Sequence, residues 1–504
     1  MSCKRSNVEA RVCVLVSFLV LSATALTATP ALALPEGRVY EQVSPVYKGG
    51  LGVGNLGGVS ADGEKAVFDS LGVFAGVQWD FLTNNYLAER ANGAGWSSSS
   101  LQPPPTGAPS SFSDGLKYAL ATHFPGQTKR EGPAESSEYI LHRVDLPNVP
   151  ANWERFGPAL ARVDGKPYEG LGVGRSGDMC HKVLGDTEPL LTETETKGTQ
   201  GQIYDDSRGC GGTEPYLRPV ALDNAGKVMN PHCRVTLGVE GIYIETPAQG
   251  HEQESQFNAI NSDGSSIFFT TSVEQNTLCH AHQLFARLGA ARTLELSKPL
   301  GETCADVPCP GALARPSAYF KGASEDGSLV YFTTPAPLVA GDEDSGSDLY
   351  LAKIGCGEAE TACAPAQRRV VAMTQVSHGP VAGQPADVQG VVQIAPDGSH
   401  VYFVANGILS EGPNAENHTP VTGADNLYVY DAQTGATVFI ADLCSGPALS
   451  GTVKDAACPS DLGVGEGDNI RNDETLWGIR GGAVHARRAR SRFQQLRPAE
   501  PGRR

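Results

Sequence analysis

The sequence predicts an all-β protein, a β-propeller of about six to seven blades of small antiparallel sheets, with the last blade incomplete. Three observations support this fold class. Long helical patterns are scarce, while glycine (59) and proline (34) are frequent in the 504 residues. Asp-Gly followed by a Val/Ile/Tyr/Phe strand recurs along the chain. Its intervals of 52 to 85 residues suit propeller blades better than solenoid repeats, and a tandem of β-sandwiches is the main alternative.

The first 33 residues have the features of a secretion signal. Lys4, Arg5 and Arg11 precede the apolar run "VCVLVSFLVL" (12–21), and "ALA" (31–33) offers a small-residue cleavage site. An uncleaved membrane anchor is the alternative, but the apolar run is short for a spanning helix. We therefore expect residues 1–33 to be a signal peptide. The mature protein would then be secreted or held in the cell envelope, without stable membrane insertion.

The repeated phrase fills residues 34–465, which we predict to be the propeller domain. Its clear copies are "VSADGEKAVF" (59–68), "INSDGSSIFF" (260–269), "ASEDGSLVYF" (323–332) and "IAPDGSHVYF" (394–403), with looser copies at Asp114 and Asp178. Asp-Gly marks a tight turn in which glycine supplies a positive φ, and a strand follows. We expect the turn aspartates Asp62, Asp263, Asp326 and Asp397 to be structural and to hydrogen-bond the turn backbone.

A second strand follows each turn strand, as in "DLYLAKI" (348–354). The combined pattern "APDGSHVYFVANG…DNLYVYDAQTGA" (395–436) resembles the TolB-type, WD-repeat-like (PD-repeat) β-propeller repeat of exported bacterial proteins. The opening "GRVYEQVSPVYKGG" (37–50) resembles uncharacterised secreted bacterial members of that group. The resemblance implies a propeller fold and an exported location. It carries no catalytic residues, because the repeat motif is structural.

Ten cysteines remain after the signal peptide, and an even number in an exported protein predicts disulfides. Three pairs lie close in sequence, so we predict local bridges Cys304–Cys309, Cys356–Cys363 and Cys444–Cys458. The connectivity among Cys180, Cys210, Cys233 and Cys279 stays open. Cys-His neighbours such as Cys180–His181 match no standard zinc spacing, which favours disulfides beside incidental histidines.

One loop has the composition of a cation site. In "GDEDSGSDLYL" (341–351), Asp342, Asp344 and Asp348 place three carboxylates around Gly346, as an oxygen-rich calcium loop would. The loop lacks the closing glutamate of the twelve-residue calcium loop, and a solvated hairpin loop is the alternative. We expect no other cofactor, because the two G-x-G-x-x-G matches (52–57 and 172–177) are not followed by an amphipathic helix.

Charge narrows the range of partners. The formal net charge is −17, and residues 34–479 alone carry −26, which argues against nucleic-acid binding. No catalytic residue stands out from the repeat. The leading hypothesis is a monomeric, non-enzymatic binding or scaffold module with a protein or glycan partner in the cell envelope. The alternative is a secreted polysaccharide lyase or glycoside hydrolase that uses acidic pairs at the channel.

The end of the chain breaks the pattern. "NIRNDETLWGIR" (469–480) begins the turn phrase, but Glu474 replaces the glycine. Residues 466–504 are therefore predicted to be a degenerate last blade and a basic, disordered tail. Two explanations of the Arg-rich stretch stay open: a genuine tail that binds anionic polymer, or out-of-frame translation of a high-GC gene.

Overall fold

The computed structural model describes most of the chain between residues 41 and 443. The described residues are 41–48, 50–60, 62–77, 83–91, 95–102, 107–123, 138–156, 163, 172–186, 189–192, 201–208, 216–229, 235–238, 257–272, 282–304, 306–309, 315–357, 360, 362–381, 383–415 and 417–443. The predicted signal peptide (1–33) and the predicted degenerate blade and tail (466–504) lie outside these residues.

Six four-stranded antiparallel sheets form the described part of the molecule, each built from four consecutive strands. Blade 1 contains β1 (Val53–Val59), β2 (Lys65–Ser70), β3 (Asn84–Ala91) and β4 (Gly95–Ser100). Blade 2 contains β5 (Gly107–Phe112), β6 (Tyr118–His123), β7 (Glu138–Arg143) and β8 (Trp153–Arg155). Blade 3 contains β9 (Gly172–Arg175), β10 (Lys182–Asp186), β11 (Gln202–Asp206) and β12 (Leu217–Pro219).

The second half repeats the same order. Blade 4 contains β13 (Val235–Leu237), β14 (Ser266–Ser272), β15 (His282–Leu288) and β16 (Arg292–Glu295). Blade 5 contains β17 (Tyr319–Ala323), β18 (Leu329–Thr334), β19 (Asp348–Gly355) and β20 (Arg369–Gln375). Blade 6 contains β21 (Val388–Ile394), β22 (His400–Ala405), β23 (Asp425–Asp431) and β24 (Ala436–Leu443).

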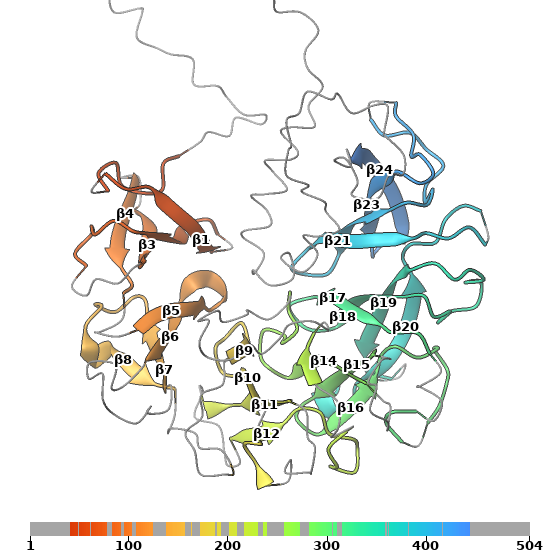
Figure 1. Cartoon of the computed structure of the whole chain (residues 1–504), viewed down its shortest axis with the longest axis horizontal. Helices are drawn as coiled ribbons and strands as arrows, with labels where there is room; N and C mark the ends of the chain where they lie inside the picture. Colours follow the sequence, from red (N-terminus) through yellow and green to blue (C-terminus); the bar gives the residue numbers. More distant parts are fainter. Residues whose placement is uncertain are drawn as a thin grey trace, which may run out of the picture.

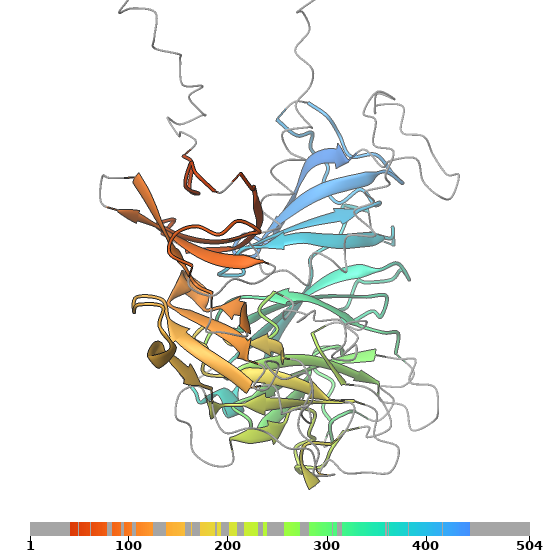
Figure 2. The ribbon, with the colours of Figure 1, turned by 60° about the vertical axis from the view of Figure 1, so that its left-hand side comes forward.

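The blades are arranged around a common centre, with their first strands inward and their fourth strands outward (Figures 1 and 2). The helical segments of the described chain are single 3-10 turns, at η2 (Asp114–Leu116), η3 (Pro150–Asn152) and η8 (Pro365–Gln367). No helix within the described residues has the length and apolarity to cross a bilayer. The predicted all-β propeller is therefore confirmed.

The repeated turn joins the first and second strands of every blade. In blades 1, 3, 4, 5 and 6, an aspartate carboxylate accepts the backbone N–H two residues later, at 2.9–3.0 Å. These aspartates are Asp62, Asp178, Asp263, Asp326 and Asp397. Ser399 donates to Asp397 and holds the pKa of that carboxyl below its ordinary value. The structural role predicted for Asp62, Asp263, Asp326 and Asp397 is confirmed, and Asp178 has the same role.

The turn of blade 2 is shifted by one residue from the position that the repeated Asp-Gly phrase predicts. Ser113 occupies the place of Ser60, because its Oγ accepts the N–H of the first strand residue after the turn, Tyr118, at 2.8 Å. Gly115 therefore stands where the other blades have aspartate, and Asp114 precedes it. The residue that follows Gly115, Leu116, has φ 52° and is buried in the core. Asp114 is thus not a turn acceptor.

Main-chain hydrogen bonds join the turns of neighbouring blades into a belt. The bonds run from Asp114 N to Gly177 O (2.9 Å), from Asp178 N to Ser262 O (2.9 Å), from Ser262 N to Glu325 O (2.7 Å) and from Glu325 N to Pro396 O (2.8 Å). They connect blades 2 to 6 in order. Because the partners are backbone atoms, the belt depends on the shape of the turn and tolerates different side chains.

Each of the first five sheets buries one side chain against the next blade. This forward position lies four residues after the positive-φ residue of the turn. In blades 1 to 5 it is at most 1% exposed, and its occupants are Val67, Leu120, Val183, Phe268 and Tyr331. Phe268 stacks on Phe320 of blade 5 at 5.5 Å, and Tyr331 donates to the Gly398 carbonyl of blade 6 at 2.7 Å. The core is thus a series of sheet-to-sheet contacts.

Glycine has a testable role at the positive-φ position of the turn. Gly63 (φ 71°) and Gly398 (φ 72°) are equivalent, but a Cβ on Gly398 would lie 2.9 Å from Ser324 Cβ, whereas one on Gly63 would meet open space. We predict that Gly63→Ala costs about 1–2 kcal/mol from backbone strain alone. Gly398→Ala should cost about 1–3 kcal/mol more, because it also overpacks the blade 5–6 contact. Urea unfolding of both variants measures this, and equal losses would contradict it.

Candidate cation site in the fifth blade

The three aspartates of the predicted calcium loop lie together between β18 and β19. One carboxylate oxygen from each of Asp342, Asp344 and Asp348 falls within 4.8 Å of the others. Tyr350 positions the loop: its hydroxyl donates to Ala336 O at 3.2 Å, accepts the Leu338 N–H at 3.3 Å and also contacts Asp342. The sequence spacing therefore located a real cluster.

The cluster concentrates negative charge in a partly buried loop. Asp348 is 1% exposed, and Ser377 Oγ donates to it at 2.6 Å. Burial raises the pKa of Asp348 to about 6, and the charges of Asp342 and Asp344 act in the same direction. Asp342 Oδ1 is buried without a hydrogen-bond donor. Asp342 Oδ1 therefore lacks the positive charge or donor that a buried carboxylate oxygen requires.

In blade 6, the uncharged Asn426 occupies the position that corresponds to Asp348. Asn426 lies two residues before Tyr428, as Asp348 lies two residues before Tyr350, and both are buried. The Asn426 amide donates to the carbonyls of Val421 (2.9 Å), Ala424 (3.0 Å) and Ala405 (3.3 Å). An ionised aspartate has no proton to donate. The cluster of blade 5 therefore has acceptors where blade 6 has a donor, which is the arrangement that a bound cation complements.

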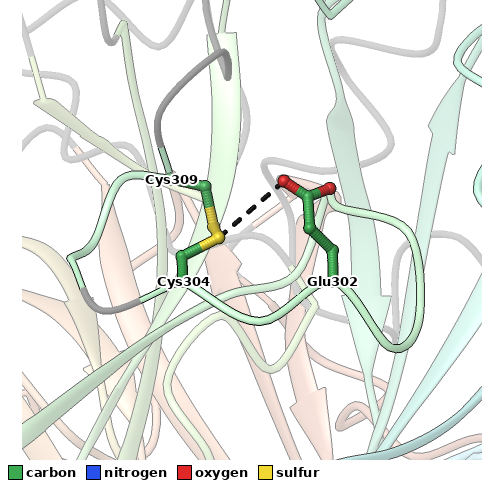
Figure 3. Close-up of side chains that lie close together, drawn as sticks. All are labelled: Glu302, Cys304 and Cys309. Atoms are coloured by element: carbon green, nitrogen blue, oxygen red, sulfur yellow. Dashed lines mark hydrogen bonds between the residues drawn. A yellow bond between two sulfur atoms is a disulfide. The ribbon is translucent and has the colours of Figure 1, made fainter.

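A second group of acidic and sulfur-bearing side chains is not a metal site. Glu302 Oε1 lies 3.8 Å from Cys304 Sγ (Figure 3). Cys304 and Cys309 form a disulfide, so neither sulfur is a thiolate that could bind a metal. The carboxylate of Glu302 instead accepts from Arg315 at 2.6 Å. The group is a stapled loop.

Arg315 also bonds the buried Glu295 at 2.6 Å, and Glu295 accepts the Cys309 N–H at 2.8 Å. Burial raises the pKa of Glu295, against the opposing effects of that N–H and of Arg315. This buried ion pair joins the stapled loop to strand β16. Its partners are 20 residues apart, and no sequence pattern identified it.

The other cysteines are placed as follows. Cys356 and Cys363 form the second predicted local disulfide. Cys180 is disulfide-bonded as well. The predicted Cys444–Cys458 pair and Cys210, Cys233 and Cys279 lie outside the described residues.

Two carboxylates flank the belt of turns. Asp114 and Glu325 belong to the belt residues of blades 2 and 5. Burial raises the pKa of Glu325, and the negative charges of Asp114 and Asp397 raise it further. Arg175 lies 3.5 Å from Asp114 and partly offsets its charge. The turn side of the propeller therefore carries an acidic pair.

His181 forms a partly buried pair with an aspartate. Its Nδ1 lies 2.9 Å from Asp205, whose side chain is 6% exposed. Burial lowers the pKa of His181, but the hydrogen bond and charge of Asp205, with the charges of Asp178 and Asp263, outweigh it and raise the pKa. The sequence showed His181 only as a neighbour of Cys180, because its partner is 24 residues away.

The raised pKa of His181 predicts a pH-dependent stability. The folded state binds the proton more tightly, so the pair stabilises the protein below the ordinary pKa of 6.5 and loses this effect as the pH rises through the folded-state pKa. His181→Gln should therefore lower the unfolding temperature more at about pH 5 than at about pH 8. His400→Gln, at the equivalent but exposed position of blade 6, is the control. A loss for His181→Gln that is independent of pH would contradict the prediction.

Comparisons with known proteins add little beyond the fold. No family model matches the chain, and no curated protein sequence matches it. Among solved structures, TolB from Acinetobacter baumannii is 10% identical, with a TM-score of 0.26, over 70% of this chain and 58% of that chain. An oligogalacturonate lyase in complex with manganese is 13% identical, with a TM-score of 0.34, over 76% and 75%.

The acylaminoacyl peptidase of Pyrococcus horikoshii is 12% identical, with a TM-score of 0.33, over 75% of this chain and 43% of that chain. This chain thus spans less than two thirds of TolB and of the peptidase. Similarities this low carry no argument about function. The propeller assignment rests on the sheets and turns of the chain itself.

Proposed function

We propose that this chain is an exported TolB-type β-propeller that acts as a non-enzymatic binding or scaffold module in the cell envelope or outside the cell. The main support for this proposal comes from the turn aspartates. Each of them accepts a backbone N–H of its own turn, so these repeated carboxylates have a structural role. Export is supported by the signal-like N-terminus and by the two local disulfides, which need an oxidising compartment.

The partner that suits this module is a protein or a glycan of the envelope. A body with a formal charge of −26 repels nucleic acid and anionic lipid. Loops on a rigid scaffold are the usual place for binding in such folds. In blades 1, 5 and 6, a buried tyrosine anchors the loop between the second and third strands by bonding a loop carbonyl: Tyr86 to Gly72, Tyr350 to Ala336 and Tyr428 to Gly407.

We propose further that Asp342, Asp344 and Asp348 hold Ca²⁺ and so fix one of these loops. Three carboxylates within reach of one another offer the hard oxygen ligands that Ca²⁺ prefers. The unpartnered Asp342 Oδ1 and the comparison with Asn426 support a cation at this place. The ion would take the place of the hydrogen-bond donor that the amide of Asn426 supplies in blade 6.

The calcium proposal predicts that added Ca²⁺ raises the unfolding temperature of the wild-type protein. Asp344→Asn should reduce this response, because it removes a ligand charge. Asp348→Asn should abolish the response without lowering the unfolding temperature in chelator, since an amide at this position can bond the loop as Asn426 does. Glu343→Gln changes an exposed carboxylate of the same loop and should keep the full response. A wild-type protein that is indifferent to Ca²⁺ would refute the site.

A second function has one specific observation in its favour. Asp114 and Glu325 form an acidic pair at the belt, and the pKa of Glu325 is raised, as a general acid requires. A secreted polysaccharide lyase or glycoside hydrolase would use such a pair. The binding module is preferred because Asp114 and Glu325 are both exposed to solvent and Arg175 partly offsets the charge of Asp114.

The two functions differ in what happens to a bound polymer. We predict that the mature protein retains a glycan or envelope protein on an array or envelope extract, and that size-exclusion analysis shows the ligand unchanged in length. Glu325→Gln should bind equally well, because the proposed module does not use this carboxyl for chemistry. Depolymerisation by the wild type that is lost in Glu325→Gln would establish the enzyme instead.

A further inference from the structure

The forward face of blade 6 differs from that of the five blades before it. Tyr402 occupies the forward position of this blade, yet it is half-exposed, whereas its counterparts in blades 1 to 5 are buried. The strand register places Tyr402 opposite Val429, and Val429 opposite Val438. Val429 is also half-exposed, and Val438 is 53% exposed. These three residues, the terminal stripe, form an apolar row across three strands.

Blade 1 does not need blade 6 to cover its own outer face. Phe68 and Tyr86 on that face are buried, and Val43, Phe74 and Val77 of the same blade and its leading segment pack against them. Phe74 stacks on Tyr86 at 3.9 Å. In the view of Figure 1, blades 1 and 6 stand at the two ends of the ribbon arc. The face of blade 1 is thus already capped.

Topology indicates what covers the terminal stripe. In blades 1 to 5, the sheet that covers the forward position is always built from the stretch of chain that follows directly. Strand β24 ends at Leu443, and the chain continues for 61 residues. Blade 6 itself extends from 388 to 443. The chain that follows is therefore long enough to provide a layer of similar size.

We infer that the terminal stripe is a docking surface for residues 444–479 of this chain. This segment precedes the basic stretch that starts at Arg480, and it contains the apolar cluster Leu476, Trp477 and Ile479. In a strand, Trp477 and Ile479 fall on the same face, as an apolar stripe on a neighbouring sheet requires. The segment closes the series of sheet-to-sheet contacts, each layer covered by the chain that comes next.

Hydroxyl-radical footprinting of the full-length chain tests the docking directly. Val438 and Val421 are almost equally exposed on the described sheets, at 53% and 51%. With residues 444–479 docked, Val438 should be oxidised several-fold more slowly than Val421. Oxidation of Val438 and Val421 at equal rates would overturn the inference.

A variant and a cross-link identify the occupant. Trp477→Asp should raise the oxidation of Val438 toward that of Val421, while Gln495→Asp in the basic stretch should leave it unchanged. A photo-reactive phenylalanine analogue at position 402 should cross-link within one chain to residues 444–479. Protection that persists in Trp477→Asp, or a cross-link between two chains, would show another occupant and overturn the proposal. Circular dichroism checks that both variants keep the sheet content of the wild type.

Discussion

The structure depends on one constraint, the shape of the turn between the first and second strands of each blade. A positive φ recurs at the fourth turn position of all six blades, and the turns from blade 2 to blade 6 present the N–H and C=O groups that join Asp114, Ser262 and Glu325 into the belt. A bond between turns fixes the angle between neighbouring sheets. Once that angle is fixed, the forward side chain of one blade falls on the core of the next.

This constraint explains why the sequence repeats so unevenly. The belt uses main-chain atoms, so the residue before the turn aspartate varies freely, from Gly177 to Glu325 to Pro396. The positive-φ position is stricter, yet Leu116 and Met179 occupy it in blades 2 and 3. Both are buried, so the packing they gain offsets the strain of the left-handed backbone. Function can then be carried by the loops, which the belt does not restrict.

The sequence predicted the repeated features well, because a turn and the strand after it are local. The six blades, the turn aspartates and the acidic loop at Asp342 followed from short patterns. The shift at Asp114 did not, since "SDG" in blade 2 matches the phrase but one residue out of register. Contacts between distant residues were equally invisible. His181 and Asp205 meet because β10 pairs with β11, and Arg315 meets Glu295 because the segment before β17 lies against the end of β16. The comparison between Asp348 and the hydrogen-bond donor Asn426 could not be made from the sequence either, because it requires the strand positions of both blades.

The belt itself can be measured by amide hydrogen exchange on the native protein. The N–H groups of Asp114, Asp178, Ser262 and Glu325 lie in turns, where amides usually exchange quickly. If the belt joins the turns, these four amides exchange as slowly as the inner strands and are released together with them. Fast exchange at these amides, at the rate of the hairpin turn near Gly435 in blade 6, would show that the turns are not bonded to one another.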